Sequence, residues 1–304
     1  MVSAIDEARS HLGELIAARP GPQSRDRHFI VGLLGRGIQA SKTPRMHELE
    51  GARLGLHYTY VLIDFDALGL ADQDLAAIIN EAEALGFAGL NVTHPFKQMV
   101  LPLLDDLASE AAIIGAANTV VFAGGRRIGH NTDSWGFAES FREGLPDVSM
   151  DAVVQFGSGG AGAAVAHALL SLGARKLMLC ETDIGRARRL ATQLCQHFGY
   201  EVEVTTDPPG ALAGASGVVN TTPVGMAKYP GIAFPGELLR PWQWVAEIIY
   251  FPPDTALLQA ARDLGCRTLS GTGMAVYQAV KAFELFTGIA PDRTAMTEHF
   301  GTQR

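Results

Sequence analysis

The feature that most constrains this chain is the glycine-rich run GSGGAG at residues 157–162. An apolar stretch, Val153–Phe156, precedes it, and an alanine- and leucine-rich stretch at 163–172 follows it. Between a strand and a helix, such glycines allow a tight turn, close approach of the backbone to a pyrophosphate and close packing of the helix, whose N-terminal N–H groups face the anion. The run therefore predicts an α/β unit that binds a dinucleotide, with a glycine turn that holds no ligand as the alternative.

A carboxylate at the end of the next expected strand bears on which dinucleotide is bound. Glu181 lies 19 residues after Gly162, where an acidic side chain accepts hydrogen bonds from the adenosine ribose and repels a 2′-phosphate. Asp183 and Arg186 lie close by, and an arginine there is either recruited by a phosphate, solvated, or placed over the adenine. Glu181 favours NAD, and NADP is the less favoured cofactor.

The rest of the chain alternates strand and helix patterns, which predicts a mostly parallel α/β fold. At 304 residues the chain exceeds the size at which one core keeps growing, so two domains are expected. Strands are predicted at 29–34, 57–64, 89–92, 119–122, 127–130, 152–156, 176–180, 203–205, 217–220 and 244–249. Helices are predicted at 5–19, 44–54, 72–85, 96–103, 106–114, 134–143, 161–172, 185–198, 255–264, 273–287 and 292–300.

Composition excludes several classes of function. A net charge of -8 leaves no basic field for a nucleic acid. No run of about 18 uncharged apolar residues and no secretion signal is present, so we expect a cytoplasmic protein. The three cysteines, Cys180, Cys195 and Cys266, lack the spacing of a disulfide framework or a zinc site, and the histidines lack ligand spacing. We therefore predict reduced thiols and no metal.

Four polar clusters stand at expected strand ends or loops of the first half: 41–44, 91–97, 117–119 and 130–133. Ligands of open α/β sheets gather at the carboxyl ends of strands, so the clusters are expected to converge. Singly, each has a structural alternative, because Ser41 or Thr43, Thr93 and Asp133 suit helix caps and Asn118 suits a turn.

Together the clusters supply what the oxidation of a polyhydroxylated acid requires. Hydroxyls and amides bind the substrate's carboxylate and hydroxyls, and a base takes the proton when hydride leaves. Lys97 serves as that base if burial lowers its ammonium pKa, and Asp133 orients it.

With further motifs, the order of these clusters resembles the shikimate/quinate dehydrogenase family over residues 28–290. The further motifs are NTTPVG at 220–225, Tyr250-x-Pro252-x-x-Thr255, and Gly271-x-x-Met274-x-x-x-Gln278. The resemblance implies a substrate domain, 1–133 with 273–304, and a Rossmann-type NAD domain, 134–272, with a cleft between them.

The resemblance also implies roles for single residues. Lys97 and Asp133 form the catalytic pair. Ser41 and Thr43, with help from Tyr250, bind the substrate carboxylate, and Thr93, Asn118 and Gln278 hold the ring hydroxyls. The cofactor side comprises Gly157, Ser158, Gly159, Gly160, Ala161, Glu181, Asp183, Arg186, Asn220, Thr221, Thr222 and Gly271.

The sequence departs from the family's commonest pattern at three places. Thr43 replaces a serine, and Glu181-Thr182-Asp183 replaces Asn-Arg-Thr or Asn-Arg-Ser; both changes resemble the NAD-preferring quinate/shikimate branch. Glu247 stands where aspartate is frequent, and the sequence offers no reason for it. The alternatives are an NADP-dependent biosynthetic shikimate dehydrogenase and a catalytically silent NAD-sensing protein. The choice between quinate and shikimate, the physiological direction and the oligomeric state stay open.

Overall fold

The computed structural model describes residues 9–10, 12–14 and 28–301. The helix predicted over 5–19 lies largely outside the described residues, and the few described there are helical. The chain divides into two compact units, residues 1–132 with 279–304 and residues 133–278. Each unit is an α/β structure around its own six-stranded sheet.

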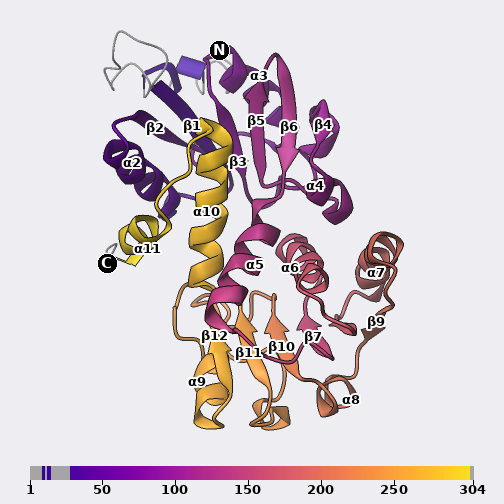
Figure 1. Ribbon diagram of the computed structural model, residues 1–304. Helices are drawn as coiled ribbons and strands as arrows, with labels where there is room; N and C mark the ends of the chain where they lie inside the picture. Colours follow the sequence, from indigo (N-terminus) through magenta and orange to yellow (C-terminus); the bar gives the residue numbers. More distant parts are fainter. Residues whose placement is uncertain (1–8, 11, 15–27, 302–304) are drawn as a thin grey trace. The chain divides into compact units, whose positions relative to one another are not determined.

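The first unit has its strands in the order β2-β1-β3-β5-β6-β4 (Figure 1). They are β1 (His28–Gly35), β2 (His57–Asp64), β3 (Gly89–Val92), β4 (Asp106–Leu107), β5 (Thr119–Ala123) and β6 (Arg126–His130). β5 runs antiparallel to β3 and β6, and the pairs β1–β2, β1–β3 and β4–β6 are parallel. The expected mostly parallel sheet is confirmed.

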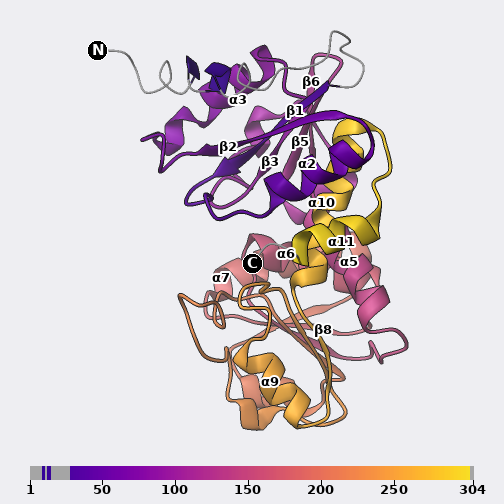
Figure 2. The same ribbon diagram turned by 90° about the vertical axis from the view of Figure 1, so that its left-hand side faces the viewer.

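Helices cover both faces of this sheet (Figure 2). They are α2 (Thr43–Arg53), η2 (Asp72–Asp74), α3 (Leu75–Ala84), η3 (Leu101–Leu103), α4 (Ser109–Ile114), the end of α10 (Thr272–Thr287) and α11 (Arg293–Gly301). On one face, Ile78 and Ile79 of α3 pack in one core with Ile63 of β2. On the other, Phe283 of α10 packs with Tyr58 of β2. Burial from both sides explains the continuous apolar run in β1, residues 29–34.

The second unit has the strand order β12-β11-β10-β7-β8-β9, all parallel, in which the order reverses at β7 and β10. This is the Rossmann arrangement. The strands are β7 (Val153–Phe156), β8 (Leu177–Cys180), β9 (Val202–Thr205), β10 (Gly217–Asn220), β11 (Trp244–Glu247) and β12 (Arg267–Leu269). Its helices are α5 (Thr132–Gly144), α6 (Gly160–Ser171), α7 (Ile184–Phe198), α8 (Pro208–Ala213), η4 (Gly236–Leu238), α9 (Ala256–Asp263) and the start of α10.

Some predicted elements differ from the structure. The helix predicted at 96–103 is a series of turns ending in η3, because Pro102 has no N–H with which to continue an α-helix. The helix predicted at 106–114 is divided into β4, which pairs with β6, and the shorter α4. α8 and β12 were not predicted. No helix among the described residues is long and apolar enough to cross a membrane.

Candidate active site

The glycine loop follows β7 and leads directly into α6, which begins at Gly160. Gly157 has a φ of +92°, which favours glycine, and a Cβ there would lie 2.9 Å from Oγ1 of Thr221. A Cβ on Gly162 would lie 2.8 Å from the carbonyl oxygen of Gly157. By contrast, Gly159 is exposed and its Cβ would meet nothing within 4 Å. Two glycines therefore permit close packing, and the middle one leaves open space in front of the first turn of α6.

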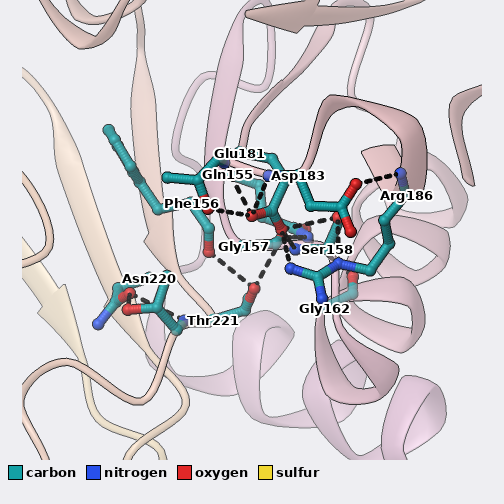
Figure 3. A network of polar contacts seen from close by, with 12 residues as sticks. Gln155, Phe156, Gly157, Ser158, Gly162, Glu181, Asp183, Arg186, Asn220 and Thr221 are labelled. Atoms are coloured by element: carbon teal, nitrogen blue, oxygen red, sulfur yellow. Dashed lines mark hydrogen bonds and ion pairs between the residues drawn. The ribbon is translucent and has the colours of Figure 1, made fainter. Parts of the chain in front are cut away.

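Two buried polar side chains, those of Gln155 and Thr221, hold this loop (Figure 3). Gln155 donates from Nε2 to the carbonyl oxygens of Gly157 and Gly162, at 2.8 Å each. The Thr221 hydroxyl, which stands 2.8 Å from the carbonyl oxygen of Phe156 and 3.0 Å from that of Gly157, completes the support. Gln155 was not among the predicted site residues, although a glutamine inside an otherwise apolar strand is a visible signal.

Glu181 is buried at the end of β8 with both carboxylate oxygens occupied. Oε2 accepts hydrogen bonds from the N–H and the hydroxyl of Ser158, at 2.8 Å each, and from Arg186 at 2.9 Å (Figure 3). Oε1 accepts from the N–H groups of Thr182 and Asp183. Burial alone would raise the pKa of Glu181, but these hydrogen bonds outweigh it and lower that pKa to about 2. The carboxylate is therefore a permanently charged acceptor.

Asp183 and Arg186 both belong to the start of α7. Asp183 is the N-cap residue, and its Oδ1 accepts from the N–H of Arg186 at 2.9 Å. The guanidinium of Arg186, 46% exposed, pairs with Glu181. Asp183 thus has a capping role, and Arg186 neutralises part of the Glu181 charge from the solvent side.

Beyond β10, the segment 220–225 forms a tight turn around one amide. Asn220 is fully buried, and its Oδ1 accepts from the N–H and the hydroxyl of Thr222, at 3.0 and 2.7 Å. Its Nδ2 donates to the carbonyl oxygen of Val224 and to Glu247, at 2.9 Å each. Gly271 lies against the same strand ends, since a Cβ there would stand 2.2 Å from the carbonyl carbon of Ile248.

In the first unit, the ends of β1 and β3 approach each other closely. A Cβ on Gly35 would lie 2.4 Å from Cγ2 of Thr93, and the N–H of Thr93 donates to the carbonyl oxygen of Leu34 at 2.9 Å. Ser41 lies in the loop after β1, where its Oγ accepts from the N–H of Thr43 at 3.3 Å. Among the described residues, the hydroxyl groups of Ser41, Thr43 and Thr93 donate no hydrogen bond. Each of these half-buried hydroxyl groups can therefore donate a hydrogen bond to a ligand.

The loop that carries Ser41 is anchored by residues that the sequence analysis did not single out. The buried Asp64 accepts from the N–H groups of Gly37 and Ile38, at 2.9 and 3.1 Å, and from Gln39 at 3.0 Å. Burial works to raise the pKa of Asp64, and these bonds together lower it. Arg36 reinforces the same loop through salt bridges to two aspartates.

Lys97 and Asn118 lie on neighbouring segments of the first unit. The carbonyl oxygen of Lys97 accepts from the N–H of Ala117 at 2.8 Å, and the Lys97 side chain is half-buried. Asn118 is buried and its Oδ1 accepts from the N–H of Thr132 at 2.7 Å. Because Asn118 also donates to the Thr132 hydroxyl, it fixes the residue that precedes Asp133.

Asp133, Tyr250 and Gln278 belong to the second unit. Asp133 is buried and lies in the first turn of α5, which begins at Thr132, so it is not the N-cap of a helix starting at Ser134. Tyr250 is 48% exposed beyond β11. Gln278 donates to the carbonyl oxygen of Ala275 on its own helix, at 3.0 Å. Over the described residues, no group of three or more histidine, cysteine, aspartate or glutamate side chains is placed to hold a metal, and the expected absence of a metal stays a prediction.

A Rossmann sheet, a glycine loop at a helix N-terminus and an acidic residue after the second strand define the class: a dinucleotide-binding α/β protein with a second α/β unit. Residues 33–120 match the family model for the substrate-binding domain of shikimate dehydrogenase, and residues 271–299 match that for the shikimate 5′-dehydrogenase C-terminal domain. The chain belongs to the shikimate/quinate dehydrogenase family, as the resemblance implied.

Some relatives are named as NAD⁺-dependent enzymes and others as NADP⁺-dependent enzymes. A shikimate dehydrogenase (NADP⁺) of Streptomyces avermitilis is 52% identical over 88% of this chain and 93% of its own. A quinate/shikimate dehydrogenase (NAD⁺) of Corynebacterium glutamicum strain R is 48% identical over 90% of this chain and 98% of its own. The solved structure of quinate dehydrogenase from Corynebacterium glutamicum in complex with NAD superimposes with a TM-score of 0.87 at 46% identity, covering 90% of this chain and 99% of that one.

Proposed function

We propose that the protein is an NAD-dependent dehydrogenase that interconverts quinate with 3-dehydroquinate, shikimate with 3-dehydroshikimate, or both. The second unit binds the dinucleotide and the first unit binds the acid. The observation that carries the cofactor assignment is the buried, ionised Glu181 at the end of β8. A fixed negative charge at this position opposes a 2′-phosphate.

The relatives support the same assignment of reaction. Quinate/shikimate dehydrogenases (NAD⁺) align over nearly their whole length with this chain, and the related quinate dehydrogenase structure holds NAD. The NAD-preferring branch was also the one indicated by Thr43 and Glu181.

The first unit offers hydroxyls suited to an acid with several hydroxyl groups. Ser41, Thr43 and Thr93 are half-buried hydrogen-bond donors, and Ser41 and Thr43 are assigned to the substrate carboxylate. Asn118 has one amide proton beyond its bond to Thr132, which suits a ring hydroxyl. Tyr250 and Gln278 are assigned to the same ligand from the second unit.

For the chemical step, a bound nicotinamide would supply the acceptor for the hydride of the carbon that bears the reacting hydroxyl. Lys97 accepts the proton of that hydroxyl through Nζ, so that the alcohol becomes a ketone, and in the reverse direction it returns the proton. Asp133 positions Lys97 and the hydroxyl. The protein's contribution is placement and proton transfer.

The test is a matrix of purified protein with NAD or NADP and with quinate or shikimate, followed by the absorbance of the reduced nicotinamide. We expect turnover with NAD and at least one of the acids, and a lower kcat/KM with NADP. Lys97→Met should lower kcat by roughly 10²- to 10⁴-fold while NAD binding survives. Lys176→Met, which removes a surface lysine paired with Glu203, is the matched control.

Three results would contradict the proposal. Turnover with NADP alone would assign the protein to the biosynthetic NADP-dependent enzymes. The Streptomyces relative is named as an NADP⁺-dependent shikimate dehydrogenase. NAD binding with no turnover of either acid would identify a silent NAD-sensing protein. An active Lys97→Met variant would remove Lys97 from the mechanism.

A further inference from the structure

Glu247, the last residue of β11, is a buried acid to which the proposed mechanism assigns no role. It is 1% exposed, and its Oε1 accepts from Nδ2 of Asn220 at 2.9 Å. Oε2 accepts from the hydroxyl of Thr255 at 3.2 Å. The N–H of Ile249 also lies near the carboxylate, whereas that of Ile248 donates to the carbonyl oxygen of Asn220 at 3.3 Å. The side chains of Asn220 and Thr255 both act as donors, and a charged acceptor satisfies both.

On one side, the carboxylate extends the turn held by Asn220. Asn220 and Glu247 are register partners on the parallel strands β10 and β11. Asn220 uses its oxygen for Thr222 and its nitrogen for Val224 and Glu247. Its orientation therefore depends on Glu247, because an amide rotated about its last bond would aim its oxygen at the carboxylate.

On the other side, the carboxylate reaches the end of the turn and the start of α9. Gly225 has a φ of +117°, and a Cβ there would lie 3.7 Å from Oε2 of Glu247 and 3.0 Å from Cδ1 of Ile249. The hydroxyl of Thr255 caps α9 by accepting from the N–H of Leu258 at 3.3 Å, and it donates to Glu247. One buried carboxylate thus bonds to Asn220 at the start of the segment 220–225 and to Thr255 at the start of α9, and it lies beside Gly225 at the end of that segment.

We propose that Glu247 is a positioning residue for dinucleotide binding: its carboxylate, through Asn220, holds the 220–225 backbone in the shape that receives the nicotinamide half of the cofactor. The assignment of this segment to the nicotinamide side rests on the proposed function. Glu247 touches neither substrate nor cofactor in this role and acts through Asn220.

The charge of Glu247 gives this role a measurable signature. Burial raises the pKa of Glu247 to about 7, against the opposing effect of its hydrogen bonds. Protonation replaces a charged acceptor by a neutral acid and weakens the bond from Asn220. NAD affinity is therefore expected to fall as the pH falls through about 7.

The hydrogen-bond partners of the carboxylate named above are neutral, and other groups on the packed elements have contacts of their own. Asp254, on the loop after β11, pairs with Arg262 of α9. Lys228, beyond the 220–225 segment, lies 5.7 Å from the ring centre of Tyr229. Tyr250 and Asp263 are the remaining titratable groups on the loop after β11 and on α9.

The experiment compares Glu247→Gln with the wild type by NAD titration calorimetry, steady-state kinetics and hydrogen exchange. The amide of Gln turns an N–H toward partners that are themselves donors. We expect the dissociation constant for NAD to rise roughly tenfold. Exchange should accelerate in peptides covering 220–225, while KM for the acid stays at the wild-type value. If Glu247 were only structural, Glu247→Gln would lower the melting temperature without raising the dissociation constant for NAD selectively over KM for the acid.

Two further variants fix the interpretation. Glu203→Gln removes a half-exposed glutamate on β9 of the same sheet, where it pairs with Lys176, and should behave as the wild type. Glu247→Asp keeps the carboxylate and should recover most of the NAD affinity. A cooperatively folded Glu247→Gln protein with wild-type NAD affinity and wild-type exchange at 220–225 overturns the proposal.

If Glu247→Gln does not fold, the wild type and Glu247→Asp still decide the matter. A wild-type NAD affinity that is flat as the pH crosses about 7 overturns the proposal, and a decline toward acid that Glu247→Asp displaces supports it. A wild type that binds NAD but oxidises neither acid refutes the proposed reaction alone, since affinity and exchange still test Glu247. A wild type that binds no dinucleotide refutes both.

Discussion

Ser158 donates both its backbone N–H and its hydroxyl to a single oxygen of Glu181, at 2.8 Å in each case. The acid that the sequence assigns to the ribose of the cofactor therefore also fixes the second residue of the glycine loop. Arg186 donates to the same oxygen. The geometry of the loop and the charge that we propose selects the cofactor depend on one carboxylate.

The first prediction concerns cofactor choice. Glu181→Ser removes the carboxylate with which Arg186 pairs, so that the Arg186 guanidinium is available to pair with a 2′-phosphate. The ratio of kcat/KM for NADP to kcat/KM for NAD should rise at least tenfold, the size of a charge-assisted hydrogen bond gained by one cofactor only. Adding Arg186→Ala to Glu181→Ser should abolish the gain, and Glu203→Ser should leave the ratio unchanged. An unaltered ratio in Glu181→Ser would show that this carboxylate does not select the cofactor.

A second prediction tests the hydroxyls of the first unit. Ser41→Ala and Thr43→Val each remove a donor that we assign to the substrate carboxylate. KM for the acid should rise about tenfold in each, because a hydrogen bond to a charged group is lost, while KM for NAD stays unchanged. Thr297→Val, on the exposed face of α11, is the control. Equal increases in both KM values would indicate a general disturbance and not a substrate contact.

The third prediction separates the two roles available to Asp133. The side chain is buried in the first turn of α5, and Asp133→Asn keeps its volume while removing its charge. If Asp133 orients Lys97, kcat should fall by roughly 10²- to 10⁴-fold with NAD affinity and melting temperature preserved. A variant that loses stability but keeps the wild-type kcat would show that Asp133 has a structural role only.

Elements with strong local signals could be predicted from the sequence. β2, β3 and β10 begin and end at the predicted residues, and almost all of their residues are buried. α6 was placed to within one residue, since glycine marks its start. The segment 96–103 misled the prediction because its apolar residues suit a helix and Pro102 does not.

The candidate site was predictable only where a residue's role depends on its own position in the chain. Glu181 follows a strand at a set spacing from the glycine loop, so its place could be found. Asp64 and Glu247 act through partners on other strands or loops, and these pairings depend on sheet register. Gln155, by contrast, acts on the loop that directly follows its own strand. Nothing in the local sequence around Glu247 specifies that Asn220 stands beside it.

The fourth prediction follows from the lowered pKa of Glu181. Its folded pKa of about 2 lies below its ordinary 4.5, so the stabilisation is present above pH 4.5 and is lost as the pH falls toward 2. Between these limits the free energy of unfolding of the wild type, relative to Glu181→Gln, should decline by about 3 kcal/mol. Urea unfolding of both proteins at stepped pH measures the difference, and a constant difference would contradict the prediction.

The fifth prediction has the opposite sign and concerns Glu247. Its folded pKa of about 7 lies above its ordinary 4.5, so the folded protein retains a proton that the unfolded chain releases. The contribution of this group to stability is therefore present below pH 4.5 and is lost as the pH rises through about 7. Relative to Glu247→Gln, the wild type should lose roughly 3 kcal/mol across that window. The mismatched amide of Gln adds an offset that does not depend on pH, so the slope of the difference in urea unfolding free energy is the quantity to measure. A slope of zero would show that the buried carboxylate is ionised at no cost.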